Sequence, residues 1–257
     1  MEQKVKARIN CGNDDKGKCS VCSGIGWTPH IEYKEEYGQN FELWSPCPKC
    51  YGINSNDITG TPLHMHDADL SRFDFTAYTV NIDKIRKIVF SLFEDWKMWQ
   101  AAGRGIYLWS KTCGSGKTFL SVALAKSVMT KYNLRMRFIT APDYVQAVGD
   151  SYKRERGERD ETQIYRECDL LVLDDIGAQI GRDWQQQELF KLINQRNSNG
   201  LITIYTSNSA PENLNVDDRT KSRIMDKSIV ILMPEESIRN RKAKEKQNEF
   251  LKELGIA

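Results

Sequence analysis

A glycine-rich segment near the middle of the chain has the residues to bind the phosphates of a nucleotide. It reads Lys111-Thr112-Cys113-Gly114-Ser115-Gly116-Lys117-Thr118-Phe119, directly after the apolar run at 106–109. Backbone N–H groups of such a turn, and of the helix that it opens, face the phosphates. We expect Lys117 to reach the β- and γ-phosphates and the Thr118 hydroxyl to bind Mg²⁺. Lys111 stands where the usual G-x-x-x-x-G-K-[ST] pattern has its first glycine, which could stiffen the start of the loop.

Two acids follow a second apolar run, which reads Leu170-Leu171-Val172-Leu173-Asp174-Asp175. A continuous apolar run is typical of a central strand in a parallel sheet. Residues at the C-terminal ends of such strands face the crevice where ligands bind. We expect Asp174 to hold Mg²⁺ and Asp175 to polarise the attacking water. The alternative is a solvated acidic turn, and the phosphate-binding segment weakens that alternative.

Four cysteines near the N-terminus have the spacing of a metal site. They form two Cys-x-x-Cys pairs, Cys19 with Cys22 and Cys47 with Cys50. Each pair can bind one ion from a tight turn, and four thiolates satisfy tetrahedral Zn²⁺ without an open position for catalysis. Because this part of the chain has little to bury, a structural zinc would supply most of its folding free energy. We leave open whether His30 or Cys11 replaces one of the cysteines.

Length and composition set limits on what this chain can be. The 257 residues allow one large domain, or a medium domain with a small appendage. A net charge of +2 gives no overall attraction to nucleic acid, so any such binding must come from local patches. The sequence shows neither a secretory signal nor an apolar run of the ~20 residues that span a bilayer. We therefore expect a cytoplasmic protein with reduced thiols and no membrane partner.

The elements that position these residues point to an α/β protein in two parts. We expect a zinc-binding, partner-binding module at 1–75, a linker helix at 76–104 and an ATPase domain at 105–257. The linker has apolar residues at helical spacing between 81 and 102. Beyond it, predicted strands at 106–109, 136–140, 170–173, 201–206 and 229–233 alternate with helical segments. Such alternation favours a parallel sheet covered by helices.

Three pieces of the chain together resemble the AAA+ ATPases of the DnaC/DnaI helicase-loader and IstB group. They are Gly-Ser-Gly-Lys-Thr at 114–118, Leu-Val-Leu-Asp-Asp-Ile-Gly-Ala-Gln at 171–179 and Tyr-Thr-Ser-Asn at 205–208. The resemblance covers roughly residues 75–241 and implies a P-loop AAA+ fold with a five-stranded parallel sheet. It also implies that Asn208 is a polar sensor of the γ-phosphate. Asp175 stands where many AAA+ proteins have the longer Glu, so we expect slow, Mg²⁺-dependent ATP hydrolysis.

The resemblance also assigns roles to three arginines. Arg219, with Arg223 as the close alternative, matches an arginine finger that reaches the γ-phosphate on a neighbouring subunit, which implies a homo-oligomer. In related NTPases such a finger is worth ~10³–10⁵ in rate. Arg239 matches a second sensor that touches the nucleotide of its own subunit. Without the family, all three would be interpreted as solvated surface residues.

A basic segment after the second predicted strand is a candidate contact for DNA. Loaders and initiators of this group place a helix here that lines a channel for single-stranded DNA. In this chain the segment carries Tyr152, Lys153, Arg154 and Arg156. Arginine, lysine and aromatic side chains suit phosphate contacts and base stacking. Intervening acids dilute the charge, so a solvated helix end remains the alternative.

The cysteine-rich module upstream of the ATPase resembles the arrangement in DnaI-type loaders, whose N-terminal domain binds the replicative helicase. We therefore predict an ATP-, Mg²⁺- and Zn²⁺-binding loader of a DnaB-family helicase onto single-stranded DNA, encoded by a phage or mobile element. Two alternatives stay open. One is an IstB-type transposition helper that binds duplex DNA. The other is a nucleotide-gated adaptor that does not hydrolyse ATP.

Overall fold

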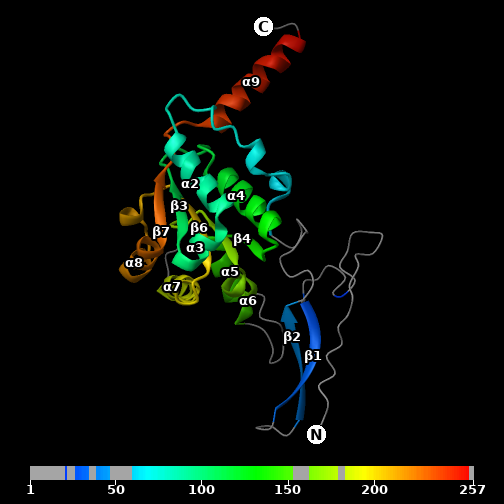
Figure 1. Cartoon of the computed structure of the whole chain (residues 1–257). Helices are drawn as coiled ribbons and strands as arrows, with labels where there is room; N and C mark the ends of the chain where they lie inside the picture. The colour runs from blue at the N-terminus through cyan, green and yellow to red at the C-terminus, as the bar shows by residue number, and fades with distance from the viewer. Residues whose placement is uncertain are drawn as a thin grey trace.

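The described part of the chain is built around one parallel sheet. The computed structural model describes residue 21 and residues 27–34, 39–46, 60–152, 162–178 and 183–254. The strands are β3 (Gly105–Trp109), β4 (Met136–Thr140), β5 (Leu170–Asp174), β6 (Ile202–Ser207) and β7 (Ser228–Leu232). They lie in the order β4-β5-β6-β3-β7, and every neighbouring pair is parallel (Figure 1). The predicted fold class is confirmed, since each predicted strand lies within one residue of an observed one.

Helices cover both faces of this sheet. In chain order they are α2 (Asp83–Glu94), α3 (Trp96–Ala102), α4 (Lys117–Tyr132), α5 (Ala141–Ser151), α6 (Gln163–Glu167), α7 (Asp183–Ser198), α8 (Asp218–Lys227) and α9 (Ile238–Glu253). The described residues also form short 3₁₀ turns, η1 (Leu63–Met65), η2 (Leu70–Arg72) and η3 (Pro211–Asn213). Residues of α2, α3 and α4 share one apolar cluster, and residues of α5, α7 and α8 share the other.

The central strand β5 shows why its sequence is continuously apolar. Leu170 and Val172 belong to the cluster on the α4 face, whereas Leu171 and Leu173 belong to the cluster on the α7 face. Successive side chains of a strand point to opposite faces. A strand covered on both faces therefore needs an apolar residue at every position.

The segment before α2 packs against α4 instead of forming a free linker. Met65, Leu70, Phe73 and Tyr78 are buried in the same apolar cluster as α4. The Ser127 hydroxyl on α4 donates to Asp69 and accepts from the backbone N–H of Leu70. Residues 65–73 thus pack with the sheet body, although they lie before the boundary that we predicted at residue 75.

The single linker helix predicted from 76 to 104 is two helices. Asp95 separates α2 from α3 with φ −127° and ψ 64°, which is not helical. Its carboxylate accepts the backbone N–H of Met98 at 3.1 Å and so caps the start of α3. Asp favours this N-cap role because its short side chain satisfies an N–H that the helix leaves unpaired.

Upstream, β1 (Trp27–Lys34) and β2 (Gln39–Pro46) pair as an antiparallel hairpin, with Trp27 opposite Pro46. The five candidate cysteine ligands, Cys11, Cys19, Cys22, Cys47 and Cys50, lie outside the described residues, as does the His30 side chain. The zinc site therefore stays a prediction.

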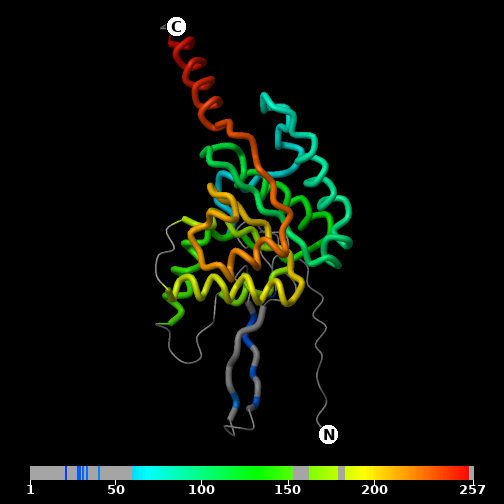
Figure 2. The backbone as a smooth tube through the Cα atoms, turned by 90° about the vertical axis from the view of Figure 1, so that its left-hand side faces the viewer, coloured from blue at the N-terminus to red at the C-terminus, as the bar shows by residue number. Residues whose placement is uncertain are grey.

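The last helix, α9, projects away from the body of the sheet in two perpendicular views (Figures 1 and 2). No residue of this helix is buried. Within the described residues, none of the helices combines the length and the apolar character that a membrane span requires.

Candidate nucleotide-binding site

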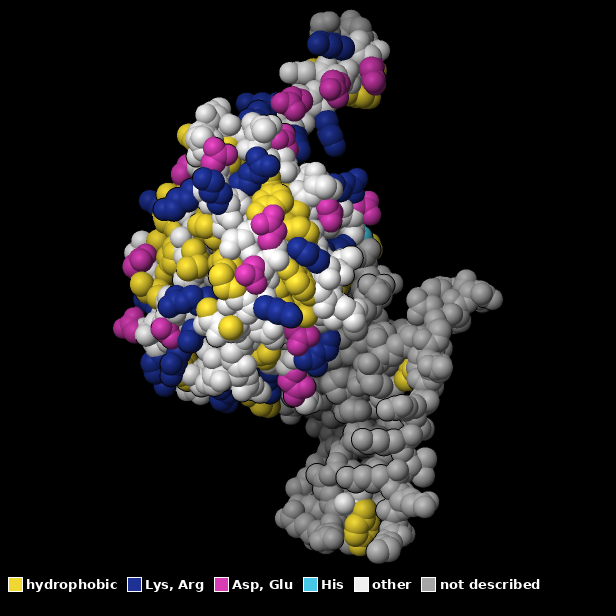
Figure 3. Space-filling view, viewed as in Figure 1, with side chains coloured by type: hydrophobic (Ala, Val, Ile, Leu, Met, Phe, Trp, Pro, Cys, Tyr) yellow, Lys and Arg dark blue, Asp and Glu magenta, His cyan; other side chains and the backbone are white. Residues whose placement is uncertain are grey.

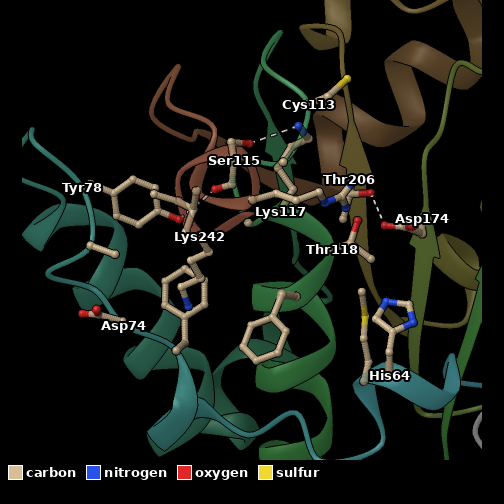
Figure 4. Close-up of a pocket in the computed structure, with 18 of the residues that line it drawn as sticks. His64, Asp74, Tyr78, Cys113, Ser115, Lys117, Thr118, Asp174, Thr206 and Lys242 are labelled. Carbon is tan, nitrogen blue, oxygen red and sulfur yellow. Dashed lines mark hydrogen bonds between the residues drawn. The ribbon is translucent and has the colours of Figure 1, made fainter. Parts of the chain in front are cut away.

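A cavity of about 490 Å³ opens where β3, β5 and β6 end and α4 begins. The phosphate-loop residues that line it are Cys113, Gly114, Ser115, Gly116, Lys117, Thr118 and Phe119. Further lining residues are Asp174, Asp175, Thr206, Asn208, Arg239 and Lys242, together with Phe73, Asp74 and Tyr78 from the segment before α2. The lining thus brings the phosphate loop, both strand-end acids and the predicted sensor residues to one place. Figure 4 shows Lys117, Thr118 and Asp174 side by side in this cavity.

Two glycines of the loop are required by their backbone and their neighbours. Gly114 has φ +80° and Gly116 has φ +94°, both in the left-handed region that favours glycine. A Cβ on Gly116 would lie 2.7 Å from the Tyr78 hydroxyl, and one on Gly114 would lie 2.8 Å from Cβ of Arg239. Lys111 meets no such demand, because the described non-glycine residues with positive φ are Asn133 and Asp175. The missing first glycine therefore leaves no backbone strain.

Lys117 is held in place by the loop that surrounds it. Its Nζ donates to the carbonyls of Ser110 and Thr112, each at 3.1 Å, and to the Ser115 hydroxyl at 3.2 Å. Burial lowers the pKa of this ammonium, and the nearby Cys113, Glu235 and strand-end acids act in the opposite direction. A buried ammonium whose hydrogen-bond acceptors are two carbonyls and a hydroxyl is well prepared to bind the negative charge of phosphates.

The two acids at the end of β5 have different surroundings. Asp174 is 8% exposed and accepts a hydrogen bond from the Thr206 hydroxyl. Burial raises the pKa of its carboxyl, while hydrogen bonds from Thr206 and Thr118 lower it. The Thr118 hydroxyl and the Asp174 carboxylate are therefore neighbours. Oxygen donors of this kind fit Mg²⁺, which takes one or two protein ligands and keeps the remaining positions for water and phosphate.

Asp175 has an unusual backbone conformation. Its φ of +54° lies in the left-handed region, where Asp is tolerated better than most residues. Its N–H donates to the Thr206 hydroxyl at 2.9 Å, and its Oδ1 accepts from Nδ2 of Asn208 at 3.3 Å. The sharp turn at Asp175 thus directs its side chain towards the predicted sensor on the next strand.

The three predicted arginines fall into two groups. Arg239 lines the cavity, and its N–H donates to the Gly114 carbonyl at 3.2 Å. Arg219 and Arg223, both on α8, are not among the residues that line the cavity of their own chain. The Arg219 guanidinium lies 4.8 Å from the centre of the Phe190 ring and 3.8 Å from the Asp217 carboxylate. Their predicted role on a neighbouring subunit stays a prediction.

Sequence reasoning missed several residues of this site. Thr206 joins the two acids, and its signal was the Thr-Ser-Asn end of β6, from which we selected only Asn208. Tyr78 donates from its hydroxyl to the Ser115 carbonyl at 2.8 Å, and burial raises its pKa to about 12. Phe73 stacks on Phe119 with ring centres 6.2 Å apart. No motif that we used marks Phe73 or Tyr78.

The candidate DNA contacts are only partly described. Lys153, Arg154 and Arg156 lie outside the described residues. Tyr152 is 66% exposed, and its hydroxyl donates to Glu188 at 2.7 Å. On the face shown in Figure 3, basic and acidic side chains are interspersed and form no large patch of one sign. The described residues of that face therefore form no continuous basic surface.

Comparison with known proteins places this site in a defined group. The family model described as the bacterial DnaA ATPase domain matches residues 96–231, more than half of the chain. The chain is 34% identical over 125 residues to the chromosomal replication initiator protein DnaA of Paraburkholderia xenovorans, covering 48% of this chain and 23% of that protein. It is 32% identical over 113 residues to the replicative helicase loader DnaI of Bacillus subtilis, covering 44% and 35%. The matches thus span about a quarter to a third of the relatives' length.

Solved structures agree with this placement. The crystal structure of the DnaC helicase loader superposes with a TM-score of 0.59 at 20% identity, covering 67% of this chain and 100% of that chain. The replication initiator DnaA bound to AMPPCP and single-stranded DNA gives a TM-score of 0.56 at 26% identity, covering 72% and 55%. The described body therefore has the fold of these AAA+ proteins.

Proposed function

Because this chain belongs to the family of the bacterial DnaA ATPase domain, we propose that it is an ATP-dependent loader of a DnaB-family replicative helicase onto single-stranded DNA. The observation that carries the ATPase part is the cavity in which the phosphate loop, Asp174, Asp175 and Asn208 meet. The loader part is supported by the similarity to DnaI and by the cysteine-rich sequence upstream.

ATP would bind with its phosphates on the loop. Lys117 Nζ would contact β- and γ-phosphate oxygens, while N–H groups at the start of α4 bind the β-phosphate. Thr118 and Asp174 would hold Mg²⁺, which neutralises charge that develops on the phosphates. Asp175 and Asn208 would orient the attacking water. Arg239 would contact the nucleotide from its own chain.

Hydrolysis would depend on a second copy of the chain. Arg219 or Arg223 would reach the γ-phosphate that is bound to a neighbouring subunit. Neither arginine lines the cavity of its own chain, which is consistent with this role. The Asp175 side chain is one methylene shorter than that of Glu, so its carboxylate would reach less far towards the attacking water. Slow turnover of this kind suits a switch, in which ATP binding loads the helicase and hydrolysis releases it.

The part of the predicted 1–75 module that precedes the packed segment at 65–73 would bind the helicase. Four thiolates from Cys19, Cys22, Cys47 and Cys50 would hold zinc and make the fold of this module depend on the metal. Residues 105–257 would form the ATPase, with DNA contacts from Lys153, Arg154 and Arg156.

Capture of the helicase by the full-length chain tests this proposal. Immobilised protein is incubated with the host's replicative helicase with ATP or with ADP, before and after zinc chelation. We expect ATP-dependent capture that chelation abolishes and that added Zn²⁺ restores, which controls for damage by the chelator. No capture by a folded, zinc-loaded chain would contradict the loader. Filament assembly that depends on duplex length would then favour the transposition helper, and ATP binding without turnover would favour the adaptor.

A further inference from the structure

The segment that joins β7 to α9, together with the first turn of α9, contacts both the phosphate loop and the segment before α2. Glu235 and Arg239 contact the phosphate loop, through the N–H groups of Lys111 and Thr112 and through the Gly114 carbonyl. Glu236 instead accepts the N–H and the hydroxyl of Thr79, in the segment that carries Tyr78. Two neighbouring glutamates thus contact the two segments that carry the phosphate loop and Tyr78.

Glu235 binds the first residues of the phosphate loop with three hydrogen bonds. Its Oε1 accepts the N–H of Lys111 at 2.9 Å, and its Oε2 accepts both the N–H of Thr112 at 2.9 Å and the Thr112 hydroxyl at 2.7 Å. These bonds lower the pKa of the Glu235 carboxyl, against the effect of desolvation. The carboxylate is therefore ionised at neutral pH, and hydrogen bonds to an ionised acceptor are the stronger kind.

The loop passes this constraint to Lys117. The Thr112 carbonyl accepts Nζ of Lys117 at 3.1 Å, so the residue that Glu235 fixes also fixes the phosphate-binding ammonium. The negative charge of Glu235 also raises the pKa of Lys117 against the effect of burial. Glu235 itself is exposed and is not among the residues that line the cavity, so it acts on the nucleotide only through the loop.

We propose that Glu235 is a positioning residue of the phosphate-binding loop, which holds the backbone of Lys111 and Thr112 so that Lys117 points at the phosphates. The inference rests on the proposed ATP binding. It assigns Glu236 the matching task on the segment before α2, where it holds Thr79 near Tyr78.

Nucleotide competition on the full-length chain tests the proposal. ATP, ADP and AMP each displace a fluorescent ATP analogue from the wild type, Glu235→Ala, Glu235→Gln and Glu236→Ala. We expect Glu235→Ala to weaken ATP and ADP about tenfold, because it removes three hydrogen bonds from the loop. AMP, which lacks the β-phosphate, should weaken by less than about twofold, since Lys117 does not bind it. Glu236→Ala, the matched control, should weaken all three nucleotides by a similar factor.

The pattern separates positioning from a general loss of stability. Equal weakening of ATP and AMP by Glu235→Ala, or no weakening, would overturn the proposal. If Glu235→Ala melts below the assay temperature, the same comparison of ATP, ADP and AMP is made with Glu235→Gln. This variant keeps the shape of the side chain but replaces the carboxylate that accepts the N–H groups with an amide. A wild type that binds ATP but captures no helicase would refute the loader and leave this inference intact. A wild type that binds no ATP would refute both.

Discussion

The two sides of the nucleotide cavity are built in different ways. The phosphate end consists of Lys117, Asp174 and Thr206, which are 8%, 8% and 2% exposed and are joined by polar contacts to their neighbours. The aromatic wall consists of Phe73, Tyr78 and Phe119, which stack with ring centres 6.2 to 6.3 Å apart and make one polar contact to the loop. The phosphate end thus holds buried charged groups in fixed positions, and the aromatic wall provides apolar surface.

This difference predicts how each side responds to substitution. Buried charged groups that share partners act as a unit, so loss of one member impairs the others. Stacked rings contribute through area and shape, so a change that keeps the ring costs little. Substitutions at the phosphate end should therefore change the rate by orders of magnitude, whereas conservative changes in the aromatic wall should change affinity by small factors.

The largest expected effect tests whether the catalytic site at the phosphate end needs an arginine from a neighbouring subunit. Arg219→Ala should keep ATP affinity and lower hydrolysis by ~10³-fold or more, as expected for a finger supplied in trans. Steady-state turnover measures this. Mixing Arg219→Ala with Asp174→Asn subunits should restore activity, because the second variant has an intact finger and the first an intact cavity.

Arg223→Ala is the matched control, four residues along the same helix. We favour Arg219 from the resemblance alone, and its guanidinium lies 4.8 Å from the centre of the Phe190 ring of its own chain. Rescue seen with Arg223→Ala alone would move the role to Arg223. Absence of rescue in both mixtures would refute a finger in trans.

The second effect concerns the buried acid. Asp174→Asn should lower Mg²⁺-dependent hydrolysis by about 10³-fold, because it removes several kcal/mol of metal-mediated stabilisation. The same change should stabilise the nucleotide-free protein at neutral pH. Burial raises the pKa of this carboxyl above its unfolded value, so its ionised form costs folding free energy.

The sign of this effect can be checked with pH. As pH falls, the wild-type carboxyl becomes protonated and its cost disappears, so the two melting temperatures should converge. Asp175→Asn is the control, because it makes the same chemical change at a half-buried neighbour and should shift the melting temperature less. Unchanged turnover of Asp174→Asn would contradict the assignment of the metal site.

The same contrast explains what the sequence could predict. The strands, the loop and both acids follow from local patterns, since a doubly covered strand such as β5 must be apolar at each position and its acids must follow directly. Tyr78 contacts Ser115 across 37 residues, and Glu235 contacts Thr112 across 123. Such pairs are created by the packing of the segment before α2 and the segment after β7. No spacing rule within one element could identify them.

The smallest effect tests the aromatic wall. Tyr78→Phe keeps the ring beside Gly116 and removes only the hydrogen bond to the Ser115 carbonyl. A single neutral hydrogen bond contributes about 1 kcal/mol net, so ATP affinity should weaken by about fivefold at most. Tyr78→Ala also removes the ring and should weaken binding further, and displacement of a fluorescent ATP analogue measures both. If Tyr78→Phe alone weakened ATP by about 100-fold, the phenol would be part of the cooperative polar network. The aromatic wall and the phosphate end would then be one unit, and the contrast between them would be wrong.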